Sequence, residues 1–100
     1  MANTEIKTRA DIKLAEPPMF KIIYMNDDET PIDFVIGSLI EHFNYTAMAA
    51  EQVTMNIHTE GAAVVAVLPY ELAEQKGGEI TIVARTQGYP LKIKLEPEVV

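Results

Sequence analysis

Two spacings of apolar side chains run through the chain, and each spacing predicts a different element. Residues 19–25 are rich in β-branched and aromatic side chains, which predicts a largely buried strand. From residue 32 to residue 43 the apolar side chains recur at steps of three and four, as on one face of a helix. The inward positions of that helix are Ile32, Val35, Ile36, Leu39, Ile40 and Phe43, and Gly37 and Ser38 lie off the stripe.

The middle of the chain predicts a second helix and a second strand. Thr46 is placed to cap a helix over residues 47–59. Gly61 follows the end of that helix, where a left-handed conformation is usual. Residues 62–68 then form an uninterrupted apolar run, which is typical of a central strand.

A third helix and a last strand complete the pattern. The helix begins at residues 69–71 and ends at Gly88. Its inward positions are Leu72, Ala73, Ile80, Val83 and Ala84. Gly77 and Gly78 interrupt it at a cost of about 1 kcal/mol each relative to alanine, and a close approach of helix to sheet would account for Gly77. Residues 91–95 alternate between apolar and polar side chains, which predicts a strand with one wet face.

The turn between the first strand and the first helix holds a dense group of polar residues. Residues 26–29 read Asn-Asp-Asp-Glu and end the strand abruptly. We predict that Thr30 caps the helix and that Pro31 fills the first helical position, where no amide hydrogen is needed. Asp33 then lies at the positive end of the helix dipole. A loop held between two rigid elements is a favourable place for binding groups.

Three strands and three helices in the order β-α-α-β-α-β predict an α+β open sandwich. In this fold class three helices cover one face of a three-stranded antiparallel sheet. A chain of 100 residues is long enough for one hydrophobic core. We expect residues 1–18 to be a flexible N-terminal arm, residues 19–96 to be the folded core, and residues 97–100 to be a short tail.

Composition narrows the classes of function. The chain has no cysteine, so disulfides, thiolate metal sites and thiol catalysis are excluded. The net charge of -7, without a cluster of Lys or Arg, argues against nucleic acid and favours a protein partner or a cationic group. No apolar run approaches the ~20 residues that span a bilayer, and no signal-peptide pattern is present, so we expect no membrane partner. We expect a cytoplasmic protein, although the plastid stroma is also compatible.

The residues by themselves indicate little chemistry. Residues 26–29 lack the spacing and the sixth-position glycine of a calcium-binding EF-hand loop. The only histidines are His42 and His58, too few for a histidine-based metal site without further ligands. No serine-histidine-aspartate signature is present. An acidic loop exposed to solvent and a structural histidine therefore remain open interpretations at this point.

Two segments carry a specific resemblance. The first is Pro17-Pro18-Met19-Phe20-Lys21-Ile22-Ile23, and the second is Asn26-Asp27-Asp28-x-Thr30-Pro31-x-x-Phe34-Val35. His58 follows Asn26 by 32 residues. The likeness continues through Gly61, Ala62, Ala73-Glu74-x-Lys76 and Tyr89-Pro90-Leu91, and covers residues 17–96. Together these segments resemble ClpS, the family of adaptors that hand N-degron substrates to the Clp AAA+ unfoldase and protease.

The resemblance implies a non-enzymatic role with no catalytic residue, no metal and no cofactor. Asn26, Asp27 and His58 would hold the free α-ammonium group of a substrate's first residue. A hydrophobic pocket for the first side chain would be formed by Asp28, Thr30, Ile32, Val35, Thr54, Ile57 and Leu91. An ammonium has three donors and no acceptor, so three acceptors suit it.

The resemblance also implies partners. Glu71 and Lys76 would dock on the N-terminal domain of the Clp unfoldase, and the arm would assist delivery. The partners would be that unfoldase and proteins with a bulky hydrophobic N-degron, and we expect a monomer.

This chain departs from the family pattern at two pocket positions. Many ClpS proteins carry methionine where Ile32 and Thr54 stand. Ile32 is stiff at its first torsion, and Thr54 brings a hydroxyl that needs a partner if buried. One alternative is therefore an unfoldase-docking modulator with altered or lost N-degron specificity. Another is an interaction module similar to the C-terminal domain of the ribosomal stalk protein, which leaves the proposed ammonium site unexplained.

Overall fold

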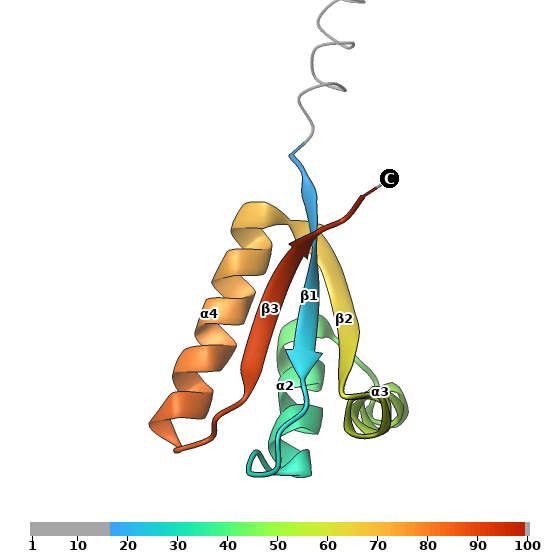
Figure 1. The fold of residues 1–100 in the computed structure, drawn as a ribbon, viewed down its shortest axis with the longest axis vertical. Coiled ribbons are helices and arrows are strands. Elements are labelled where there is room, and N and C mark those ends of the chain that lie inside the picture. Colours follow the sequence, from blue (N-terminus) through green and yellow to red (C-terminus); the bar gives the residue numbers. More distant parts are fainter. Residues whose placement is uncertain (1–16, 100) are drawn as a thin grey trace, which may run out of the picture.

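The computed structural model describes residues 17–99, so the predicted arm lies almost wholly outside the described residues. Its elements are β1 (Met19–Met25), α2 (Ile32–Phe43), α3 (Ala47–Glu60), β2 (Ala62–Pro69), α4 (Tyr70–Thr86) and β3 (Lys92–Pro97) (Figure 1). The predicted order β-α-α-β-α-β and the α+β class are confirmed. Predicted and observed bounds agree to within two residues at every element end.

The sheet has the strand order β2-β1-β3, with both pairings antiparallel (Figure 1). The interpretation of residues 62–68 as a central strand is wrong, because β1 occupies the centre and β2 lies at an edge. The register shifts between Ile22 and Ile23, which leaves Val65 as an extra residue on β2. Val65 is buried, and its carbonyl accepts a hydrogen bond from the Tyr45 hydroxyl at 2.6 Å.

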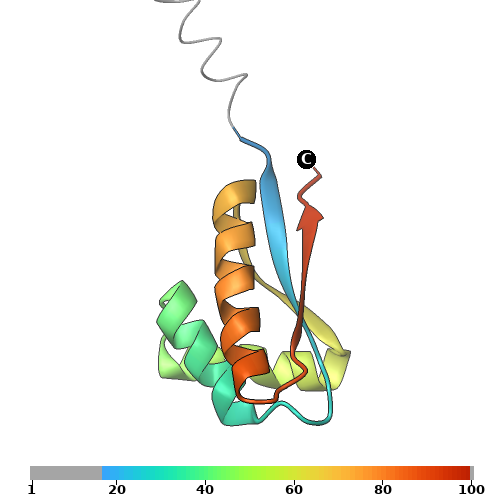
Figure 2. The ribbon, with the colours of Figure 1, turned by 90° about the vertical axis from the view of Figure 1, so that its left-hand side faces the viewer.

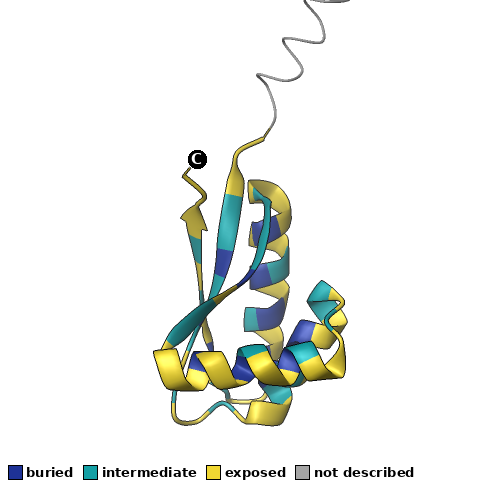
Figure 3. Ribbon diagram, turned by 90° about the vertical axis from the view of Figure 1, so that its right-hand side faces the viewer, coloured by how far each residue is buried: buried dark blue, intermediate teal, exposed yellow. Residues whose placement is uncertain are grey.

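The helices bury one face of β1. Ile22 and Tyr24 are fully buried on this face, whereas Lys21 and Ile23 belong to the opposite face. Helix α4 lies along the sheet and contacts all three strands, while α3 contacts β2 and α2 (Figure 2). Buried positions recur along each helix, which leaves a mostly exposed outer side (Figure 3).

The inner side of α2 differs from the predicted stripe. Ile32 and Ile40 are exposed, whereas Ser38, which the pattern places off the stripe, is buried. Ser38 Oγ donates to the Val35 carbonyl at 2.8 Å, so the Tyr24 hydroxyl donates to Ser38 Oγ, also at 2.8 Å. Burial raises the pKa of the Tyr24 phenol to about 12. The tertiary hydrogen bond explains why a polar residue occupies a core position.

The inner side of α4 is narrower than predicted. Its buried residues are Ala73, Gly77, Ile80 and Ala84. Leu72 and Val83 were predicted inward but are exposed, since each lies one residue, about 100° of turn, from the strip that meets the sheet. A Cβ added at Gly77 would lie 3.6 Å from Ile93 Cγ2, an ordinary contact, so close approach does not require glycine there. Nothing in the structure explains Gly78, where an added Cβ would meet open space.

Two predicted helix ends are confirmed. Thr46 Oγ1 accepts a hydrogen bond from the amide of Ala49 at 3.1 Å, which caps α3. At the other end Gly61 adopts φ 88° and donates to the carbonyl of Ile57 at 2.9 Å. These two caps fix the first and last residues of α3, and therefore the position of His58 relative to β1.

Candidate ligand-binding site

Four segments meet where β1 ends: the β1–α2 loop, the first turn of α2, the second half of α3, and the connection between α4 and β3. The amide of Asn26 donates to the carbonyl of Gly61 at 2.9 Å, which ties the start of the loop to the end of α3. This backbone bond continues the pairing of β1 with β2 by one residue and so holds the loop beside the end of α3.

The side chain of Asp27 holds the loop in shape. Asp27 Oδ1 accepts from the amides of Glu29 at 2.8 Å and Thr30 at 2.7 Å, and Oδ2 accepts from the Thr30 hydroxyl at 2.8 Å. The prediction that Thr30 caps α2 is therefore wrong. Pro31 is the N-cap residue, so the prediction that it fills the first helical position is also wrong. Its ring offers no hydrogen bond to the helix amides, and the Thr30 hydroxyl is bound to Asp27 instead.

Asp27 is held in its ionised form. Partial burial acts to raise the pKa of the Asp27 carboxyl. The hydrogen bonds from Thr30 and Glu29 outweigh it, together with the positive charge of Arg85, and hold the pKa below its ordinary value. Three of about four acceptor sites are used internally, which leaves capacity on Oδ2 for an external donor.

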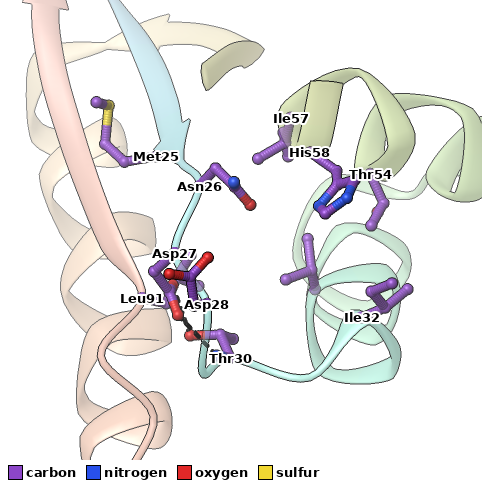
Figure 4. Close-up of a pocket in the computed structure, with 11 residues that line it drawn as sticks. Met25, Asn26, Asp27, Asp28, Thr30, Ile32, Thr54, Ile57, His58 and Leu91 are labelled. Atoms are coloured by element: carbon purple, nitrogen blue, oxygen red, sulfur yellow. Dashed lines mark hydrogen bonds between the residues drawn. The ribbon is translucent and has the colours of Figure 1, made fainter. Parts of the chain in front are cut away.

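All ten residues predicted for substrate binding line one cavity of about 220 Å³ (Figure 4). They are Asn26, Asp27, Asp28, Thr30, Ile32, Val35, Thr54, Ile57, His58 and Leu91. The structure thus brings every predicted member together, and the part each plays in binding stays a prediction.

Hydrogen-bond acceptors lie at the mouth of this cavity, and its buried wall is mostly apolar, with Thr54 as the buried polar member. Asn26 and His58 are exposed, and their side chains point toward one another across the space between the loop and α3 (Figure 4). Val35, Ile57 and Leu91 are buried. Hydrogen-bond acceptors at the mouth above an apolar interior suit a ligand with a cationic head and an apolar side group.

Sequence reasoning missed residues that line or support the cavity. Met25 also lines it, although its side chain extends away from the other residues drawn in Figure 4. Arg85 Nη1 donates to the carbonyls of Tyr89 and Leu91, both at 2.8 Å, and so fixes the connection that carries Leu91. The rings of Phe34 and Tyr89 pack edge to face with centroids 5.1 Å apart, which joins α2 to the same connection. No local pattern indicates such contacts, because their partners are remote or on a loop.

Among the residues that the structure describes, no group of three or more His, Cys, Asp or Glu side chains is placed to hold a metal ion. His42 Nδ1 lies 3.8 Å from Glu79 Oε2 on α4, while His58 belongs to the cavity. Within the same described part, no helix is both long and apolar enough to cross a membrane.

A family model described as "ATP-dependent Clp protease adaptor protein ClpS" matches residues 15–94. The chain belongs to the ClpS family. It is 38% identical over 96 residues to the Clp protease adapter ClpS of Helicobacter hepaticus, covering 96% of this chain and 97% of that protein. It is 41% identical over 97 residues to ClpS 1 of Bradyrhizobium diazoefficiens, covering 97% and 96%. The sequence resemblance to ClpS is confirmed.

A solved ClpS structure shares the fold. Agrobacterium tumefaciens ClpS2, bound to L-phenylalaninamide, matches with a TM-score of 0.79 and 36% sequence identity. The match covers 83% of this chain and 100% of that chain. Membership of the ClpS family replaces the ribosomal-stalk-like module as an interpretation of this fold.

The ClpS residues predicted to dock on the unfoldase lie away from the cavity. Glu71 is exposed in the first turn of α4, and Lys76 is half-buried further along that helix. The start of α4 adjoins the start of β1, where the amide of Tyr70 donates to the carbonyl of Pro18 at 3.2 Å (Figure 1). The cavity lies at the other end of β1, so the two surfaces are separate.

Proposed function

We propose that this ClpS-family chain is a non-enzymatic adaptor that binds the free N-terminal residue of substrate proteins and delivers them to a Clp AAA+ unfoldase. The observation that carries the proposal is the set of acceptors at the mouth of the apolar cavity. Asn26, Asp27 and His58 are the acceptors, and each would take one of the three ammonium hydrogens.

Asp27 supports the choice of an ammonium over a neutral group. Its lowered pKa keeps a negative charge at the mouth, and Oδ2 retains acceptor capacity. An amide nitrogen inside a peptide has one hydrogen and no charge, so it would leave the other acceptors without partners. Hydrogen bonds to charged groups contribute about 1.5–3 kcal/mol, which is enough to separate chain ends from internal peptide groups.

The size of the cavity supports the recognition of one side chain. A volume of about 220 Å³ is below the roughly 300–1,000 Å³ of pockets that enclose a whole drug-sized molecule. Its buried wall of Val35, Ile57 and Leu91 favours an apolar side chain. The relative from Agrobacterium tumefaciens has L-phenylalaninamide bound, a compound that joins an α-amino group to a benzyl side chain.

The start of α4 supports a separate docking surface for the unfoldase. Next to Glu71 is an apolar hollow of about 450 Å³. Its lining residues are Pro17, Pro18, Phe20, Pro69, Tyr70 and Glu71. Phe20 and Tyr70 pack with ring centroids 4.8 Å apart, so a rigid apolar surface adjoins the charged residue. Such a surface with a polar rim is typical of protein interfaces.

A pair of peptides tests the proposal. The full chain is titrated with fluorescent peptides that begin with phenylalanine and differ only in a free or an acetylated N-terminus. We expect acetylation to weaken binding at least tenfold, because it removes the charge and two of the three hydrogens. Equal affinity for the two peptides would show that the cavity does not recognise a chain end.

A further inference from the structure

One hydroxyl group among the residues that line the cavity has no hydrogen-bond partner. Thr54 on α3 is only 4% exposed, and its Oγ1 is enclosed and unpartnered. Within residues 17–99 it is the one buried side-chain nitrogen or oxygen in this condition. Buried polar groups are nearly always satisfied, and an exception in a native fold indicates a missing partner.

The other threonines in the described helices act differently. Each donates its hydroxyl to the carbonyl four residues earlier, at 2.7–3.0 Å. These pairs are Thr59 with Met55, Thr81 with Gly77, and Thr86 with Ile82. Thr54 has no such bond although Ala50 occupies the same relative position, and Thr54 is the helical threonine that lines the cavity. The Thr54 hydroxyl therefore has no internal partner, although Oγ1 itself is enclosed.

Helix geometry places Thr54 beneath the mouth of the cavity. Thr54 and His58 are four residues apart, so they share a face of α3 and are separated by about 6 Å of helical rise. If the ammonium group of a peptide's first residue binds at His58, the side chain of that residue can extend toward Thr54. The distance is comparable with the length of a tyrosine side chain. Oγ1 is enclosed, so contact with a ligand requires Thr54 to rotate about Cα–Cβ, and the rotated hydroxyl would bond either the ligand or the Ala50 carbonyl.

We propose that Thr54 is a specificity-determining residue that makes the cavity prefer tyrosine over phenylalanine as the first residue. This inference rests on the proposed binding of N-terminal residues. The phenol both donates and accepts, so it satisfies the Thr54 hydroxyl, whereas the phenyl ring of phenylalanine leaves that hydroxyl unpaired. The neighbouring wall residues Val35, Ile57 and Leu91 offer no side-chain partner to either oxygen.

The test compares two peptides that differ by one oxygen. Peptides beginning with tyrosine or phenylalanine are titrated against the full chain and against Thr54→Val and Thr54→Ser. In the wild type, tyrosine should bind about two- to tenfold more tightly than phenylalanine. Thr54→Val keeps the shape and removes the hydroxyl, so the ratio should fall to one or below. Thr54→Ser keeps the hydroxyl and should retain a preference for tyrosine.

Thr81→Val is the matched control. This variant removes a hydroxyl that donates to the Gly77 carbonyl on α4, outside the cavity. The ratio of the tyrosine to the phenylalanine affinity should therefore equal that of the wild type. An unchanged ratio in Thr54→Val, with native thermal unfolding, would overturn the role of the hydroxyl. A wild-type protein that ignores N-terminal acetylation would instead overturn the proposed function. The two failures are therefore distinguishable.

Discussion

Replacement of Asp27 by asparagine separates the charge of the site from the shape of its loop. Asp27 Oδ1 accepts two backbone amides, and asparagine retains that oxygen. The Thr30 hydroxyl now donates to Oδ2, but it can rotate and accept from the new amide nitrogen. Asp27→Asn should therefore leave the loop folded while it removes the negative charge and one acceptor from the mouth.

The expected loss follows from the one acceptor site that Asp27 leaves for the ligand. A charge-assisted hydrogen bond to an ammonium contributes about 1.5–3 kcal/mol. Asp27→Asn should therefore lower the affinity for a peptide with a free N-terminus by about 10- to 150-fold. Asp27→Ala also removes three loop hydrogen bonds, so it should bind more weakly than Asp27→Asn and unfold at a lower temperature.

Fluorescence anisotropy with a peptide beginning with phenylalanine measures the effect, and Asp33→Asn is the control. Asp33 lies in the first turn of α2, is exposed and does not line the cavity. Asp33→Asn changes the net charge of the protein by the same amount as Asp27→Asn. We expect a change of less than about twofold for Asp33→Asn, because solvent screens exposed charges. Wild-type affinity in Asp27→Asn, or an equal loss in Asp33→Asn, would refute a direct role for Asp27.

Three further predictions use other parts of the structure. His58→Ala should weaken binding of a peptide with a free N-terminus at least tenfold, because it removes one of the three acceptors; an unchanged affinity, with native unfolding, would contradict this. The double variant Glu71→Ala/Lys76→Ala should weaken unfoldase binding in a pull-down without altering peptide affinity, and unimpaired delivery would contradict the proposed docking surface. Gly77→Ala and Gly78→Ala should each raise the free energy of unfolding in urea by about 0.5–1 kcal/mol, since an added methyl meets only ordinary contacts or open space; a decrease would indicate a need for glycine.

The lowered pKa of Asp27 sets the pH range over which the mouth of the cavity keeps its negative charge. Its carboxyl has a lowered pKa, so its contribution is present above the ordinary value of 3.8 and is lost only as pH falls below that value. Asp27 therefore stays ionised at neutral pH.

Local sequence determined the elements and most of their ends. The strand β1 and the ends of α3 at Thr46 and Gly61 follow from side chains within a few positions of one another. The residues that line the cavity were also predicted from sequence, but by a different route. Their spacing matches a family motif, and periodicity alone left residues 26–29 as an acidic loop and His58 as a lone histidine.

Only the tertiary structure decided which groups meet. Ser38 is buried because Tyr24, on a strand 14 positions earlier, reaches its hydroxyl. Strand order could not be read from the apolar run of β2, because composition reports burial and does not report which strand pairs on both sides. Thr30 could bond either the helix amides or Asp27, and the path of the loop selected Asp27. The Thr54 hydroxyl is unpartnered for a similar reason, since its surroundings depend on four segments that meet only in the folded chain.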